Sequence, residues 1–218
     1  MVIPALDEAE RIAAAVDSAR AADVEVIVVD GGSSDDTAER AAAGGARVIT
    51  APRGRARQLD AGARASLGEA LLFLHADTLL PAGYDAAVRR ALRDPRVVGG
   101  AFRLRFDQAT RALRWIERGA RLRVALFGLP YGDQALFVRR ATLAAIGGIP
   151  QVPVLEDLDL VRAMRRQGRL ALLPLDAVTS ARRYLARGPW RTAWRHALGA
   201  LAWSIGMDRA RVAAWVRR

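Results

Sequence analysis

Acidic side chains stand where two apolar, strand-like segments of this sequence end. Asp30 directly follows Val24–Val29, and Asp77 comes shortly after Ala70–Leu74; both segments have the length and apolarity of buried parallel strands. A solvent-facing carboxylate at the position of Asp77 could hold Mg²⁺ or Mn²⁺ together with substrate phosphates, because these ions take only one or two protein carboxylates. The alternative for Asp77 is to cap the helix that follows.

Glycine and serine follow Asp30 in the segment Gly31-Gly32-Ser33-Ser34. Glycines let a ligand approach the backbone closely, and Asp30 could then accept hydrogen bonds from a nucleobase or a ribose. The same residues could form a strand-to-helix turn in which Ser33 or Ser34 caps the helix. The first predicted strand is followed by Pro4-Ala5-Leu6-Asp7 instead of the spaced glycines of a dinucleotide fingerprint, which argues against a dehydrogenase.

Arginines cluster after the next predicted strand, Arg47–Thr50. Arg53, Arg55 and Arg57 lie within five residues of one another there. Guanidinium groups pair well with phosphate oxygens. Acids, glycines and arginines at one rim of a sheet are the groups that a nucleotide diphosphate needs.

Two polar segments in the second half could contribute to the same cleft. Glu156 and Asp157 open a predicted helix, where acids are expected because of the helix dipole, and one of them could be a general base. The turn Gly132-Asp133-Gln134 could line the cleft or merely connect two elements.

The order of elements predicts an α/β fold with a doubly wound, mostly parallel sheet, in which ligands bind beyond the carboxyl ends of the strands. The expected strands are Met1–Pro4, Val24–Val29, Arg47–Thr50, Ala70–Leu74, Val97–Phe106 and Gln134–Arg139. The expected helices are Glu8–Ala22, Ser34–Ala43, Gly54–Ser66, Thr110–Ala125 and Leu155–Gln167. We find no repeats and no linker, so the 218 residues are expected to form one domain.

The amino-acid composition excludes several classes of catalytic and binding site. The chain has no cysteine and two histidines, which excludes disulfides and cysteine nucleophiles and leaves little material for Ser–His hydrolases. Residues 1–109 carry a net charge of −2, and residues 110–218 carry +13. All 34 basic residues are arginine and the chain lacks lysine, which indicates a compositional bias and not a nucleic-acid-binding surface.

The C-terminal region combines basic and aromatic residues. Residues 178–218 hold nine arginines against one acid, interleaved with Trp190, Trp194, Trp203 and Trp215. This pattern suits a helix that touches a membrane surface or a polyanion, and it equally suits a packed helix with a solvated face. The uncharged stretch in this region is about a dozen residues, too short to span a membrane, and no signal peptide is recognisable, so we expect a cytoplasmic protein.

Taken together and in this order, these segments resemble family 2 glycosyltransferases of the GT-A fold, over about residues 1–183. The motifs that carry the resemblance are Val2–Glu8, Val28–Thr37, Gly54–Gln58, His75-Ala76-Asp77-Thr78 as the DXD-like element, Gly132–Phe137 with Arg139-Arg140, and Glu156-Asp157 as the ED element. The chain is similar to a small bacterial branch that is often encoded beside radical-SAM and selenium-related genes. The resemblance implies a nucleotide-sugar-binding half (1–100), an acceptor half (101–183) and a basic helical tail (184–218).

The resemblance also implies roles for individual residues. Those expected to bind the nucleotide are Pro4, Glu8, Asp30, Arg53, Arg55 and Arg57. Asp77 would hold Mg²⁺ or Mn²⁺, and Gly132, Asp133 and Gln134 would lie on the acceptor side. Asp157 would be the base, with Glu156 beside it, in a single displacement that moves a sugar from a nucleotide diphosphate donor to an acceptor hydroxyl and inverts its anomeric configuration.

Two positions depart from the family pattern. Asp7 stands where many members have asparagine, and His75 replaces the first acid of the DXD element, which removes one hard oxygen ligand for a metal. Two other classes of function stay open on the sequence. One is a sugar-activating nucleotidyltransferase, although the glycine-rich phosphate loop expected after the first strand is missing. The other is a non-catalytic module that binds nucleotides or a membrane surface.

Overall fold

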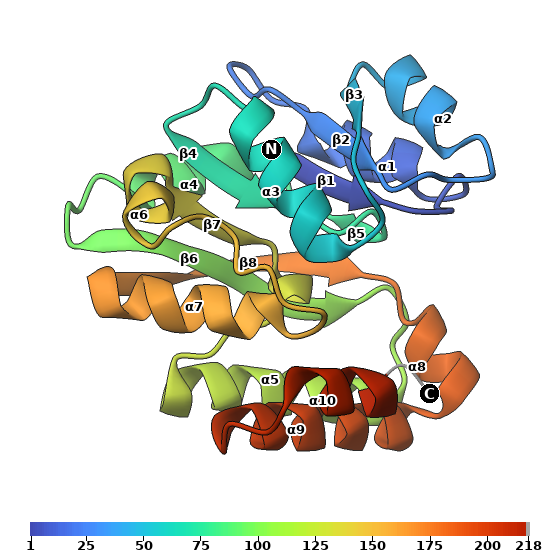
Figure 1. Cartoon of the computed structure of the whole chain (residues 1–218), viewed down its shortest axis with the longest axis vertical. Helices are drawn as coiled ribbons and strands as arrows, with labels where there is room; N and C mark the ends of the chain where they lie inside the picture. Colours follow the sequence, from blue (N-terminus) through green and yellow to red (C-terminus); the bar gives the residue numbers. More distant parts are fainter. Residues whose placement is uncertain (217–218) are drawn as a thin grey trace.

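A single eight-stranded sheet organises the molecule, seen in a computed structural model that describes residues 1–216, with side chains to residue 213 (Figure 1). The strand order is β3-β2-β1-β4-β7-β6-β8-β5. The strands are β1 (Val2–Ala5), β2 (Ile27–Asp30), β3 (Arg47–Thr50), β4 (Ala70–Phe73), β5 (Thr78–Leu79), β6 (Val97–Phe106), β7 (Leu136–Arg139) and β8 (Arg169–Thr179). The fold is the expected α/β class, with helices on both faces of the sheet.

The first four strands in chain order form the parallel part of the sheet, β3-β2-β1-β4. Their central residues are apolar, those of β2 and β3 are β-branched, and Ile3, Val28 and Val29 are fully buried because helices cover both faces. Helix α3 (Arg55–Ala65) packs so closely on this part that a side chain at Gly62 would lie 2.3 Å from Val2. Buried Gln58 of the same helix donates to the carbonyls of Ala5 (2.8 Å) and Val29 (2.9 Å) and so joins two strand ends.

The remaining strands change direction. β7 is antiparallel to β4 and β6, β8 is parallel to β6, and the short β5 is antiparallel to β8. No strand was predicted at the position of β8, which contains Pro174, a residue that cannot donate a ladder hydrogen bond. The sheet accommodates this proline at an irregularity, where the register with β6 shifts between Leu172 and Asp176.

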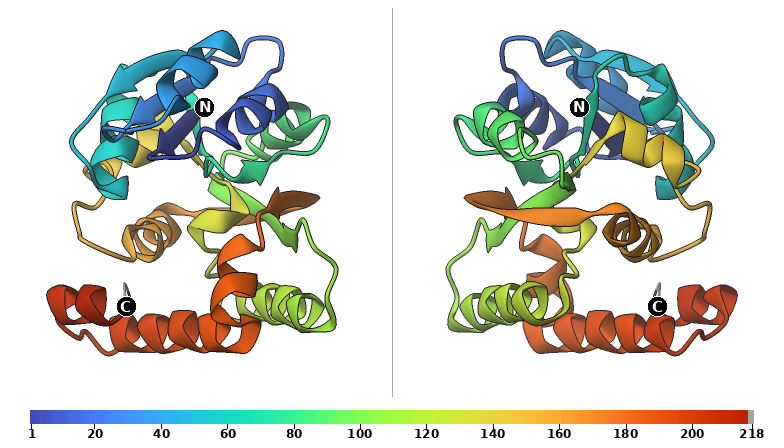
Figure 2. Two further views of the ribbon diagram at one scale, coloured as in Figure 1. Left: turned by 90° about the vertical axis from the view of Figure 1, so that its right-hand side faces the viewer. Right: turned by 90° about the vertical axis from the view of Figure 1, so that its left-hand side faces the viewer.

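The helices form two groups. Those packed on the sheet are α1 (Ile12–Ala19), α2 (Thr37–Ala43), α3 (Arg55–Ala65), α4 (Tyr84–Ala91), α6 (Arg140–Ala145) and α7 (Glu156–Gln167). A separate layer consists of α5 (Arg111–Phe127), α9 (Pro189–Ser204) and α10 (Arg209–Val216), joined to the sheet by α8 (Arg182–Arg187) (Figures 1 and 2). The tail is therefore helical, as expected. In the described part of the chain, no helix is both long enough and apolar enough to cross a membrane.

The main departure from the expected elements lies after β1. The predicted helix Glu8–Ala22 begins only at Ile12 and ends at Ala19. The preceding residues form a loop because side chains from another segment accept their N–H groups: Ser33 accepts from Asp7 (3.0 Å) and Thr37 accepts from Glu8 (2.8 Å). The short helices α4 and α6 were also not predicted. The hydrogen bonds to Ser33 and Thr37 fix the loop that contains Glu8 at the carboxyl ends of the strands.

Candidate functional site

A cavity of about 1270 Å³ opens between the carboxyl ends of the strands and the helices α8 and α9. Four acids line it, together with His75, His196 and a set of arginines. The acids are Asp77, Asp133, Glu156 and Asp157, and the arginines are Arg53, Arg55, Arg57, Arg182, Arg183, Arg187 and Arg195. Residues expected to act together, although distant in the sequence, therefore share one space.

The ED element stands at the start of α7. Leu155 precedes the helix with a φ of +62°, and Glu156 is its first residue, with 3% of its surface exposed. Arg55 forms an ion pair with Glu156 and also approaches Asp157, with 3.6 Å between its Nη2 and the aspartate Oδ1. Arg55, expected at the nucleotide, thus neutralises part of the charge of the two carboxylates.

Asp157 is held by backbone donors. Its Oδ2 accepts the N–H of Gly132 at 2.8 Å, and its Oδ1 accepts the N–H of Leu158 at 3.0 Å. A side chain at Gly132 would lie 3.1 Å from both Asp157 Oδ2 and His75 Nε2, so glycine permits this close approach. The carboxylate keeps 14% exposure toward the cavity and is fixed in orientation, which suits a base that must meet an acceptor hydroxyl.

Asp77 lies at the rim of the sheet, as predicted. The expectation that its side chain faces open solvent is wrong. Its side chain is 11% exposed because β8 and α8 cover it, and Arg182 approaches its Oδ2 at 3.7 Å. The capping alternative is wrong: the next helix, α4, begins at Tyr84 after Gly83 and has no side-chain cap. Asp77 is thus available to a ligand in the cavity.

The histidine of the DXD-like element is neutral at physiological pH. Burial, with the nearby Arg55 guanidinium as the second cause, lowers the pKa of His75 to about 4. Its Nε2 lies 3.3 Å from Arg55 Nη1. Because the His75 ring is uncharged, it adds no second positive charge beside the Arg55 guanidinium.

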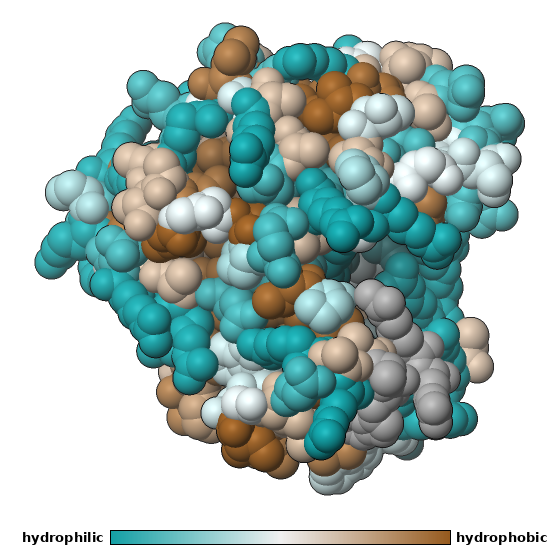
Figure 3. Space-filling view, viewed as in Figure 1, coloured by the Kyte–Doolittle hydropathy of each residue, from teal (hydrophilic) through white to brown (hydrophobic). Residues whose placement is uncertain are grey.

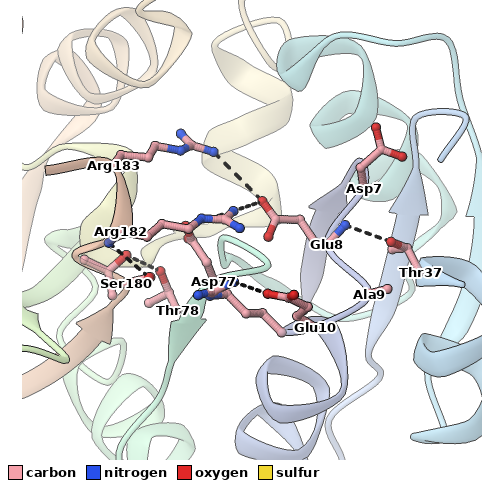
Figure 4. A network of polar contacts seen from close by, with 12 residues as sticks. Asp7, Glu8, Ala9, Glu10, Thr37, Asp77, Thr78, Ser180, Arg182 and Arg183 are labelled. Atoms are coloured by element: carbon pink, nitrogen blue, oxygen red, sulfur yellow. Dashed lines mark hydrogen bonds and ion pairs between the residues drawn. The ribbon is translucent and has the colours of Figure 1, made fainter. Parts of the chain in front are cut away.

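Arg182 joins the two halves of the chain and was not identified from the sequence. It forms an ion pair with Glu8 and reaches between that residue and Asp77 (Figure 4). Arg183 lies 3.9 Å from the same Glu8 oxygen. The other oxygen of Glu8, Oε2, is buried with no hydrogen-bond partner in the described residues. Glu8 therefore positions α8 over the site.

Asp30 ends β2 and is 6% exposed. Its carboxylate accepts the N–H groups of Gly32 (3.0 Å) and Ser33 (3.1 Å) as well as the Ser33 hydroxyl. These bonds fix the glycine-containing loop, where Gly32 has a φ of +88°. The serines do not cap α2, which begins at Thr37 after Asp36 without a side-chain cap.

The segment 132–134 forms a short 3₁₀ helix whose residues have different surroundings. Gln134 is 2% exposed and structural: it donates to the Phe102 carbonyl (2.9 Å) and accepts from Arg123 (2.9 Å). Burial raises the pKa of Asp133 to about 6, against the effect of nearby Arg123. Asp133 Oδ1 is buried and unpaired within the described part of the chain, so this carboxylate is held at a cost to stability.

The predicted residues thus divide into two sets. Those that line the cavity are Arg53, Arg55, Arg57, Asp77, Asp133, Glu156 and Asp157. Pro4, Glu8, Asp30, Gly132 and Gln134 stand outside its lining; Pro4 pairs with Val29 in the parallel sheet. A further pair was not predicted: the Tyr184 hydroxyl lies 3.0 Å from His196 Nδ1, and both residues line the cavity.

The donor set suits a divalent ion that binds mainly through substrate phosphates. Among residues 1–216, no three acids, histidines or cysteines gather as a metal cage. Asp77, beside neutral His75 in a cavity rich in arginine, offers the single carboxylate that Mg²⁺ or Mn²⁺ needs when phosphates supply the other oxygens. The residues fit such an ion.

Comparison with known proteins agrees with this architecture. The chain belongs to glycosyl transferase family 2, whose model matches residues 1–141. No curated protein sequence matches the chain. Among solved structures, a mycobacterial protein is 27% identical with a TM-score of 0.58; the match covers 82% of this chain and 63% of that one, so the chain spans less than two thirds of that protein's length.

Other similar structures were solved in complex with ligands. Glucosyl-3-phosphoglycerate synthase from Mycobacterium tuberculosis, in complex with Mn²⁺, UDP and glucosyl-3-phosphoglycerate, is 22% identical with a TM-score of 0.67. The same enzyme with Mn²⁺, UDP-glucose and glycerol 3-phosphate also has 22% identity and a TM-score of 0.67. Each match covers 95% of this chain and 79% of the other. They show that this chain has the GT-A fold.

Proposed function

We propose that the protein transfers a sugar from a nucleotide diphosphate donor to a hydroxyl group of an anionic acceptor, with inversion at the anomeric carbon. The observation that carries this proposal is the shared cavity of Asp77 and Asp157, with arginines around both. Membership of glycosyl transferase family 2 supports it and favours a glycosyltransferase over the alternative nucleotidyltransferase.

Asp157 is the proposed base. The acceptor hydroxyl gives its proton to the Asp157 carboxylate as its oxygen forms a bond to the anomeric carbon, and the bond from that carbon to the diphosphate oxygen breaks. Glu156 is buried against Arg55, and it supports Asp157 by keeping the guanidinium in place. The hydrogen bonds from Gly132 and Leu158 set the orientation of the carboxylate before the substrate arrives.

The departing diphosphate carries the negative charge that develops in this step. Arg53 and Arg57 line the cavity from the segment after β3 and have no ion pair with any described residue, so both are available to phosphate oxygens. Asp77 would hold Mg²⁺ or Mn²⁺, which when bound stabilises negative charge on the diphosphate. Pro4 and Asp30, at adjacent ends of β1 and β2, would support the nucleoside, with Asp30 fixing the loop 31–33.

The charge of the cavity indicates the acceptor class. Arg55 and Arg182 are already paired with acids, whereas Arg187 on α8 has no ion pair within the described residues. A donor diphosphate with its divalent ion adds little net charge, so the arginines near α8 favour a second anion. The similar synthase was solved with phosphoglyceric acid and with glycerol 3-phosphate, both of which are anionic hydroxyl compounds.

A donor and acceptor panel tests this function. Purified protein with Mn²⁺ is incubated with UDP-, GDP-, ADP- and dTDP-sugars, each with glycerol 3-phosphate, 3-phosphoglycerate or uncharged glycerol. We expect release of a nucleoside diphosphate that phosphorylated acceptors stimulate more than glycerol, and a product whose anomeric configuration, read by NMR, is inverted. Retained configuration would contradict the single displacement, and formation of a nucleotide sugar from a nucleoside triphosphate and a sugar phosphate would show a nucleotidyltransferase.

A further inference from the structure

The layer formed by α5 and α9 exposes a concentration of large apolar side chains. Ten of the fourteen large apolar side chains that are exposed among the described residues belong to these helices or to the turn after α9. They are Trp115, Leu122, Leu126 and Phe127 on α5, and Trp190, Trp194, Leu198, Leu201, Ile205 and Met207 on or after α9. We call this set the outer face.

On α9 the exposed residues form one stripe. Trp190, Trp194, Leu198, Leu201 and Ile205 follow one another at intervals of three or four residues, which places them on the same side of a helix. The opposite side of α9 is buried, where Thr192, Gly199 and Trp203 pack inward. Trp203 is 5% exposed and its indole N–H donates to Asp159, so this tryptophan does not belong to the outer face.

A second stripe runs along α5. Trp115, Leu122 and Leu126 are each at least 59% exposed, and they lie opposite the buried residues Leu113 and Ala120. The two helices contact each other and lie side by side in the lowest layer of the molecule (Figures 1 and 2). Apolar residues are visible at this lower end among polar ones (Figure 3). Both stripes point away from the core, and they lie on two helices that contact each other.

Positive charge surrounds this surface. Exposed arginines on α5 are Arg111, Arg114, Arg118 and Arg121, and Arg191 is exposed at the start of α9. The guanidinium of Arg118 lies 5.0 Å from the centre of the Trp115 ring. The one acid of α5, Glu117, turns inward and accepts the N–H of Phe106 at 2.8 Å. No acid occurs on α8 or α9, and Asp208 follows α9.

We propose that the outer face docks on the surface of a lipid bilayer that contains anionic lipids. Tryptophans beside arginines, with an apolar stripe between, match the boundary between acyl chains and negatively charged headgroups. A second copy of the chain is a poorer occupant, because it would bring two arginine-rich rims together. The helices lie on the bilayer and do not cross it.

Docking in this orientation brings the cavity close to the bilayer. The inner side of α9 contributes Thr192, His196 and Gly199 to the cavity lining, whereas its outer side carries Trp194 and Leu198. One helix, about 10 Å across, therefore separates the cavity from the lipid surface. The sequence had placed membrane contact in residues 184–218 alone; the structure adds α5 and removes Trp203, while the side chain of Trp215 and residues 217–218 lie outside the described part.

Vesicle co-sedimentation tests the proposal with the full chain. Binding is measured on vesicles of pure phosphatidylcholine and on vesicles containing about one third phosphatidylglycerol, at low and high salt, since salt screens the attraction. The test variants are Trp194→Gln/Leu201→Gln/Ile205→Gln on α9 and Trp115→Gln/Leu122→Gln/Leu126→Gln on α5. The matched control is Leu67→Gln, because Leu67 is 86% exposed but belongs to the connection between α3 and β4 and not to the outer face.

We expect the wild-type chain and Leu67→Gln to bind the anionic vesicles, less so at high salt, and each triple variant to bind at least about tenfold more weakly. Circular dichroism checks that each variant is folded. Because there are two independent triple variants, the test still works if one of them does not fold. Equal binding to both kinds of vesicle, or unchanged binding in both triple variants, would overturn the proposal. So would a concentration-dependent dimer that the triple variants abolish, since a second copy would then cover the face.

Discussion

Replacing Asp133 with asparagine should make the protein more stable at neutral pH. Burial raises the pKa of this carboxyl from 3.8 to about 6, and its Oδ1 has no partner in the described residues. Because the folded state favours the protonated form, the stability that Asp133 contributes is full below about pH 4 and is lost as the pH rises through about 6. Asparagine carries no charge at any of these pH values, so it avoids this loss.

The expected size follows from the change in pKa. Moving it from 3.8 to about 6 corresponds to about 3 kcal/mol of unfolding free energy at pH values well above 6. Urea denaturation at about pH 4 and about pH 7.5 measures the effect in the wild type and in Asp133→Asn. Asp17→Asn is the matched control, because it removes the same charge from an exposed position and should change stability by less than about 0.5 kcal/mol.

Two results would refute this reasoning. If Asp133→Asn is no more stable than the wild type at about pH 7.5, the carboxylate is paired or solvated in the folded protein. If the gain is the same at both pH values, it arises from packing and not from the charge. The activity of the variant is informative as well: we expect it to fall, because a group kept in a lining position at a cost to stability is typical of a functional site.

Two further variants examine the donor side. Asp30→Ala should weaken the binding of a nucleoside diphosphate, measured by calorimetry. It should also lower the unfolding free energy by about 1–3 kcal/mol, because it leaves the N–H groups of Gly32 and Ser33 unpaired. Undiminished affinity in a folded variant would remove Asp30 from the nucleotide site. In Asp77→Ala, Mn²⁺ should no longer increase the affinity for a nucleoside diphosphate, whereas the affinity for the nucleoside should be nearly unchanged. If Mn²⁺ increases the affinity equally in the wild type and the variant, the metal is held elsewhere.

The parallel part of the fold was predictable because its signals are local. Arg47–Thr50 and Val97–Phe106 are strands with the expected bounds, and short apolar runs with β-branched residues indicated the other strands of the first half. Glu156 opens its helix as predicted. By contrast, β8 contains Pro174 and gains its place by pairing with β6 and β5, long-range contacts that no local pattern encodes.

The site was only partly predictable, because its contacts join distant segments. Strand ends pointed to Asp77, the helix start pointed to Glu156 and Asp157, and the family resemblance selected Asp157; the structure brings all three to one cavity. The pairing of Arg55 with the ED element, and of Arg182 with Glu8, connects residues about 100 and 174 positions apart. Arg55 was expected at the nucleotide and not at the ED element, and no local pattern marks Arg182 among the 34 arginines of the chain.

The catalytic role of Asp157 is the central claim, and single-turnover rates at matched donor saturation test it most directly. Asp157→Asn keeps the size of the side chain but cannot accept the proton, so the rate should fall by roughly 10²–10⁴-fold while donor affinity stays within a few-fold. Glu156→Gln should lower the rate less, since Glu156 acts through Arg55. A near-normal rate in Asp157→Asn with a collapsed rate in Glu156→Gln would transfer the role to Glu156, and normal rates in both would contradict the mechanism.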